Sequence, residues 1–307
     1  MSDLRGRELG DSAVGCAIRA FTGGMDAHFT ASQPPLTRGD RPALLLPAAS
    51  WLSGALAVIA TLTSLFGLAT DWPYAVETDN WRLQAQGQDA GNLLAVAVLI
   101  AGLAGARRGS LRGLLLWVGA LLYLAYTFVL YAVTIHFGPL FPAYVACLGL
   151  AAYALILTLT RPLPAIELPA RAARTASVVL LAIGVCFALL WLSSIVGALV
   201  AGHAPAEILR AGLPSNPVHV LDLALVLPAM LMTAINTRRG SPPARFLLAP
   251  WLVFSTLIAA SLVAVAAFSG GPLALAIGFL VVAALSGGAA TLVLRGVPSQ
   301  HDSVPSL

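Results

Sequence analysis

Eight long apolar runs are the feature of this sequence that most restricts its fold. They cover about residues 47–69, 89–106, 113–133, 139–160, 176–200, 217–237, 246–268 and 273–294. Each run holds roughly 18–25 residues, which is enough for a helix to cross a hydrocarbon core about 30 Å thick. The runs are continuous rather than alternating, and a helix satisfies its own backbone hydrogen bonds in lipid. The sequence therefore predicts an all-α integral membrane protein with eight transmembrane helices in a lipid bilayer.

Composition excludes several classes of protein. Hydrophobic residues make up 59% of the chain and charged residues 10%, too little charge to cover a soluble domain. All 17 basic residues are arginine, so a Schiff-base lysine and the lysine of a phosphate-binding loop are both excluded. The arginines flank the membrane runs, and we therefore expect no nucleic-acid partner. No motif indicates a reaction, so whether the protein is an enzyme, its cofactors and its oligomeric state are left open.

The chain divides into two membrane halves with tails. Residues 1–43 contain no apolar core long enough for a signal peptide and are predicted to be a disordered cytoplasmic tail, with Met1 or Met25 as the start. We expect a first four-helix half at 44–160 and a second at 176–295. A Pro-rich cytoplasmic linker at 161–175 joins them, and a cytoplasmic tail at 296–307 follows.

Arginine placement predicts the orientation of the helices. The tails and the even-numbered loops hold 15 of the 17 basic residues, whereas the odd-numbered loops hold only Arg82 and Arg210. Because basic loops stay in the cytoplasm, both termini are predicted to be cytoplasmic. The opposite, outer face then carries acidic residues, three of the five histidines and aromatic residues typical of a membrane interface.

The two halves share a pattern that favours an internal repeat. "DAGNLLAVAVLIAGLAGARRGS" begins at Asp89 and "DLALVLPAMLMTAINTRRGS" begins at Asp222, 133 positions later; the same offset relates Gly138 to Gly271. Two parallel four-helix repeats, related by an axis along the membrane normal, are one interpretation. The other is a chance match between generic cytoplasmic turns in a chain rich in Leu and Ala.

The sixth apolar run carries two ionisable residues, His219 and Asp222. Ser215 and Asn216 are typical N-cap residues and Pro217 is favoured in a first helical turn, so the span is predicted to begin near residue 217. Asp222 then lies roughly 7–8 Å along the helix, with His219 on the same face one turn nearer the outer surface. A charged aspartate facing lipid costs about 3 kcal/mol, so we expect Asp222 to face the protein interior or water.

Two interpretations of this pair remain open. In the first, His219 and Asp222 hydrogen-bond each other or an outer arginine and hold two helices in register. In the second, they line an outward-open cavity and act as a proton acceptor, ion ligand or substrate anchor.

Four other residues are weaker candidates. Asp89 heads the second apolar run, where a carboxylate complements the helix dipole, so capping is predicted ahead of a role in a binding site. Tyr126 and Tyr131 either bridge helices or supply hydroxyls to a polar cavity beside Asp222. His136 is considered with His219 as a metal ligand, although no spacing signature supports such a site.

Several stretches resemble a widespread family of uncharacterised bacterial multi-pass membrane proteins. These are Gln88-Asp89 heading a span, "RRGSLRGLLLWVGALLYLAYTFVLYA", "FGPLFPAYVACLGLAAYAL" and "VHVLDLALVLP". The likeness covers roughly residues 50–295. It implies a protein of the bacterial inner membrane with an outer-facing polar cluster, and it implies no activity.

The leading functional hypothesis is a protein that binds and transports a small solute or ion through an outward-facing polar cavity. Its candidate site residues are Asp222, His219, Asp89, Tyr126 and Tyr131. The alternatives are a membrane-embedded enzyme that depends on a metal or haem, and an accessory structural subunit.

Overall fold

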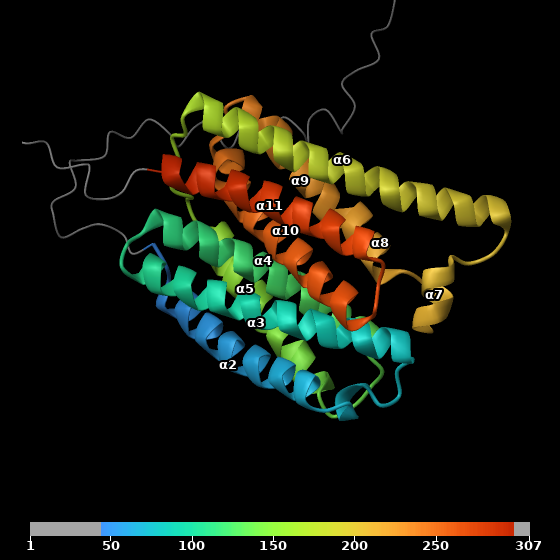
Figure 1. Cartoon of the computed structure of the whole chain (residues 1–307). Coiled ribbons are helices and arrows are strands. Elements are labelled where there is room, and N and C mark those ends of the chain that lie inside the picture. The colour runs from blue at the N-terminus through green and yellow to red at the C-terminus, as the bar shows by residue number, and fades with distance from the viewer. Residues whose placement is uncertain (1–43, 298–307) are drawn as a thin grey trace, which may run out of the picture. The chain divides into compact units, whose positions relative to one another are not determined.

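The computed structural model describes residues 44–297, and they form an all-helical bundle (Figure 1). Eight helices in this range are long and apolar enough to cross a membrane, judged by length and composition. The all-α class and the number of spans are thus confirmed for these residues. The predicted tail at 1–43, and all but the first two residues of the one at 296–307, lie outside the described residues.

The sixth span differs from the others because its helix is interrupted. Its first turn is α8, followed by one π-helical turn, η2, and then by α9. Two short elements, η1 and α7, lie in connections. The elements are α2 (Pro47–Ala69), η1 (Trp72–Tyr74), α3 (Asp79–Arg107), α4 (Leu111–Thr134), α5 (Phe141–Leu159), α6 (Ala170–Ala201), α7 (Ala206–Ala211), α8 (Pro217–Leu221), η2 (Asp222–Val226), α9 (Leu227–Arg238), α10 (Pro242–Phe268) and α11 (Leu273–Gly296).

Three helices begin earlier than the apolar runs predict. α3 begins at residue 79 instead of 89, α6 at 170 instead of 176, and α10 at 242 instead of 246. Thr78 caps α3, since its hydroxyl oxygen accepts a hydrogen bond of 3.2 Å from the Trp81 amide. Hydropathy marks only the part of a helix that lies in lipid, so a polar first turn is missed. The expected starts were wrong for this reason.

The eight spans pack as two groups of four. Helices α2 to α5 contact one another in the cyclic order α2, α3, α4, α5, and α6, α9, α10 and α11 do so in the corresponding order. α10 packs against both α3 and α4 and joins the two groups, whereas the sixth span meets α4 at α8. α2 and α6 lie at opposite edges of the bundle (Figure 1). That the groups form an internal repeat stays a prediction.

Glycines allow the central helices to approach closely. A Cβ at Gly102 would lie 2.6 Å from the Trp117 backbone nitrogen, and one at Gly119 would lie 2.6 Å from Val253 Cβ. The first contact joins α3 to α4 and the second joins α4 to α10. Small residues commonly allow such packing in membranes, because lipid tails are as apolar as the side chains and no hydrophobic effect drives the helices together.

The two ends of the bundle differ in charge. The end that carries the turns between α3 and α4, α5 and α6, and α9 and α10 is called the arginine-rich end, after Arg107, Arg108, Arg112, Arg161, Arg171, Arg174, Arg238, Arg239 and Arg245. The other is called the acidic end, after Asp71, Glu77, Asp79 and Glu207. Which side of a membrane each end faces stays a prediction from arginine placement.

Candidate functional site

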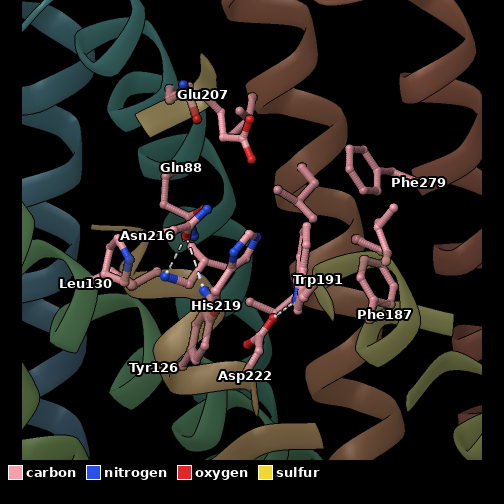
Figure 2. Close-up of a pocket in the computed structure, with 18 of the residues that line it drawn as sticks. Gln88, Tyr126, Leu130, Phe187, Trp191, Glu207, Asn216, His219, Asp222 and Phe279 are labelled. Atoms are coloured by element: carbon pink, nitrogen blue, oxygen red, sulfur yellow. Dashed lines mark hydrogen bonds between the residues drawn. The ribbon is translucent and has the colours of Figure 1, made fainter. Parts of the chain in front are cut away.

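A cavity of about 540 Å³ lies in the half of the bundle nearer the acidic end. Its walls come from α3, α4, α6, the sixth span, α10 and α11, and α7 contributes to its rim. Most of its lining side chains are apolar, and several polar ones converge among them (Figure 2). The rim includes the exposed residues Glu207, Arg210 and Ser215, so the cavity opens at the acidic end.

The sixth span begins as the sequence predicts. The side-chain oxygen of Asn216 accepts hydrogen bonds from the amides of Val218 (3.1 Å) and His219 (3.2 Å), and Pro217 follows it directly. The cap fixes the start of the helix, so His219 and Asp222 lie one turn apart and both line the cavity.

Asp222 begins the π-helical turn of this span. The turn ends just before Pro228, which has no amide hydrogen and whose ring would clash with the carbonyl four residues earlier in a regular α-helix. A π turn is one way to absorb this mismatch, and such turns are frequent at functional sites. Asp222 therefore stands where the backbone of the span is irregular.

The partner of Asp222 comes from another helix. Trp191 of α6 donates its indole N–H to Asp222 Oδ2 at 2.8 Å, and the Tyr126 side chain of α4 faces the same carboxylate (Figure 2). Asp222 is only 9% exposed. Within residues 44–297 it has no salt bridge to a basic side chain. The carboxylate thus has neutral donors around it and no counter-ion.

His219 stacks on the same tryptophan. The ring centroids of His219 and Trp191 are 4.5 Å apart, with the planes inclined by 37°. No hydrogen bond joins His219 to Asp222 in the described part of the chain. The direct hydrogen bond and the arginine partner of the first interpretation are therefore not found among residues 44–297, and Trp191 contacts both residues instead. Whether the pair holds helices in register or serves a binding site stays open.

Gln88 forms the opposite wall of the cavity. Its side-chain nitrogen donates to the Tyr123 hydroxyl at 2.7 Å and to Thr127 at 3.2 Å, and its oxygen accepts from Ser261 at 2.8 Å. These bonds tie α3 to α4 and α10. Gln88 is fixed by three helices, so this wall is preorganised.

Asp89, the next residue, points into a separate group that we call the Asp89 cluster: Tyr74, Asp89, Asn92 and Tyr131. The Tyr74 hydroxyl donates to Asp89 Oδ2 at 2.6 Å, and the Tyr131 hydroxyl lies 3.0 Å from Asp89 Oδ1 and 2.9 Å from the Ala85 carbonyl oxygen. Asp89 is fully buried and is the eleventh residue of α3. The predicted capping role is wrong, because the helix begins ten residues earlier.

The Asp89 cluster attaches the connection between α2 and α3 to the bundle. Tyr74 lies in η1, outside the spans, and burial, followed by the neighbouring Asp89 charge, raises its pKa well above the ordinary value. Gly67 of α2 leaves the space that the pair occupies, because a Cβ there would overlap Asp89 Oδ2 and lie 2.7 Å from the Tyr74 hydroxyl. Of the two candidate tyrosines, Tyr131 belongs to this cluster and Tyr126 lines the cavity.

The two histidines considered as metal ligands belong to different surroundings. His136 pairs with Glu77: its amide donates to Glu77 Oε1 at 2.7 Å, and its Nδ1 lies 3.0 Å from both carboxylate oxygens. His219 lines the cavity. Among residues 44–297, no three His, Cys, Asp or Glu side chains converge as metal ligands.

Trp191 and Tyr74 are the aromatic residues of these sites that sequence reasoning missed, and Gln88 and Asn92 are missed polar ones. Both aromatic side chains carry a polar hydrogen that needs an acceptor once water is absent. Trp191 is the single tryptophan of an otherwise apolar run, which could have suggested a buried acceptor nearby. Tyr74 lies in a loop rich in aromatic and acidic residues that is also typical of an interface belt.

No protein-family model, curated protein or solved structure matches this chain. The resemblance to a bacterial membrane-protein family stays a prediction. The described residues establish a multi-pass helical architecture of the kind that spans membranes.

Proposed function

We propose that this protein is a carrier of the bacterial inner membrane that binds a small solute at Asp222 and His219 and moves it across the bilayer. The observation that carries the proposal is a buried carboxylate, at an open cavity, that has no basic partner within residues 44–297. Buried ionisable groups in membrane spans are costly and usually serve a function. Asp89 also lacks a basic partner in the described part of the chain, but tyrosine hydroxyls hold both of its oxygens in a closed cluster, whereas Asp222 lines an open cavity.

The position of the cavity supports a carrier. Its walls come from both groups of four helices, which is where transporters built from repeated halves hold their substrate. α3 packs extensively on α10, whereas the sixth span contacts α4 mainly through α8. The cavity occupies the space between these helices. Relative movement of the two groups would change access to it.

Arginine placement supports an orientation for this carrier. If the arginine-rich end faces the cytoplasm, both termini are cytoplasmic and the cavity opens to the outer side. The interrupted sixth span fits the same proposal, because irregular backbone at membrane depth is tolerated where it lines a cavity.

Cysteine labelling tests the proposal without a known substrate. The probe is Met230→Cys, a deep cavity-lining position that is 2% exposed, in a background where Cys16, Cys147 and Cys186 are alanine. A membrane-impermeant maleimide is applied to right-side-out and inverted vesicles. Leu209→Cys, 67% exposed on α7, serves as the labelled control, and Leu124→Cys, fully buried in α4, as the unlabelled one.

A carrier exposes its site to each side in turn, so Met230→Cys should react from both faces. Reaction from the outer face alone would mean that the protein binds its solute without transporting it. If Met230→Cys stays as unreactive as Leu124→Cys from both faces, the cavity is closed to water and the proposal fails.

A further inference from the structure

The ionisable groups around the cavity determine whether it favours a positively or a negatively charged ligand. Four ionisable residues line it: Asp222, His219, Glu207 and Arg210. Glu207 accepts a hydrogen bond of 3.0 Å from Ser194, and in residues 44–297 neither carboxylate forms a salt bridge with Arg210. In Figure 2 Glu207 lies toward one end of the cavity and Asp222 toward the other. The deep part therefore holds a carboxyl group without a basic partner among the described residues. When this group is ionised it attracts cations and repels anions, and the effect is strong because little water screens it.

The aromatic lining adds to this preference. Tyr126 and Trp191 direct their polar edges at the Asp222 carboxylate, and Phe187, Phe254 and Phe279 also line the cavity. A cation that reaches the face of an aromatic ring gains about 0.5–2 kcal/mol. A carboxylate in such an aromatic lining is well suited to an ammonium group.

The size and mostly apolar lining of the cavity favour an organic molecule over a bare metal ion or a sugar. A cavity of about 540 Å³ lies within the range of roughly 300–1,000 Å³ typical of sites for small organic molecules. A bare metal ion needs several oxygen ligands, and a sugar needs hydrogen-bonding groups on all sides. The walls are instead mostly aliphatic, with Leu130, Ile183 and Ile258 among them.

We infer that the ligand of this cavity is a small amphipathic organic cation, with its ammonium group at Asp222 between Tyr126 and Trp191 and its apolar body against the aliphatic walls. This inference rests on the proposed function, because it names the substrate class of the same site. Asp222 supplies the charge, Trp191 holds the carboxylate in place through its 2.8 Å hydrogen bond, and Gln88 fixes the facing wall.

Binding of matched probes tests the inference. Benzyltriethylammonium is titrated into the purified full-length protein in detergent, and binding is followed by calorimetry. Phenylpropanesulfonate, an anion with a similar apolar body, is the comparison. The cation should bind and the anion should not. Asp222→Asn should weaken binding of the cation by about tenfold or more, whereas Glu207→Gln, at the rim, should change it less than about threefold.

A second measurement does not depend on how Asp222→Asn folds. In the Met230→Cys protein, which retains Asp222, bound cation should slow maleimide labelling and the anion should not. Equal protection by both probes would overturn the inferred substrate class. Labelling from both membrane faces without protection by the cation would also overturn the inferred substrate class, but it would leave the carrier proposal in place.

Discussion

Replacing Tyr74 by phenylalanine removes one hydroxyl from the Asp89 cluster and almost nothing else. That hydroxyl donates to Asp89 Oδ2 at 2.6 Å, and both residues are fully buried. No water reaches the carboxylate to replace the lost donor. Leaving a buried acceptor without its donor costs about 1–3 kcal/mol, and we expect Tyr74→Phe to lower the free energy of unfolding by that amount. For a chain of this size the melting temperature should fall by about 2–12 °C.

The assay is thermal unfolding of the purified protein in detergent, followed by circular dichroism. Tyr153→Phe is the matched control, since it makes the same chemical change on α5 at a side chain that is 65% exposed. It should alter stability by less than about 0.5 kcal/mol. If Tyr74→Phe melts within about 1 °C of the wild type, or if the two variants lose the same stability, the cluster does not hold the connection as argued.

Three further predictions follow from the same structure. Gly67→Ala should destabilise the protein because its Cβ would overlap Asp89, whereas Gly54→Ala, on the same helix with nothing within 4 Å, should be neutral or slightly stabilising. Equal melting temperatures of the two variants would contradict the close approach of α2 to Asp89. Tyr74 stays protonated in the folded protein, whereas in the unfolded chain it releases its proton above about pH 10, so stability falls as the pH rises above that value. In denaturant titrations above about pH 10, the wild type should lose up to about 1.4 kcal/mol per pH unit more than Tyr74→Phe. Reporter fusions after residues 110, 168 and 241 should read cytoplasmic and those after 80, 137, 208 and 270 external, and one consistent inversion would refute the orientation.

The number of spans and the start of the sixth helix could be read from the sequence because both depend on local chemistry. The hydrocarbon core of a bilayer requires a continuous apolar run in each span, regardless of which other helices that span packs against. Asn216 and Pro217 define a helix start through bonds to residues two and three positions away, and i, i+3 spacing then puts His219 and Asp222 on one face. Hydropathy did not find the start of α3, because nearly three mostly polar turns precede its apolar run.

The partners of the two buried aspartates were decided only by tertiary packing. Trp191 is 31 residues from Asp222, and Tyr74 and Tyr131 are 15 and 42 residues from Asp89. Which of several aromatic residues reaches a carboxylate depends on how far helices are rotated and shifted along one another. The close approach of α2, α3, α4 and α10 through small residues sets these positions. The sequence could therefore identify Asp222 as buried, but only the packing shows that it faces a cavity and has a tryptophan, rather than an arginine, as its partner.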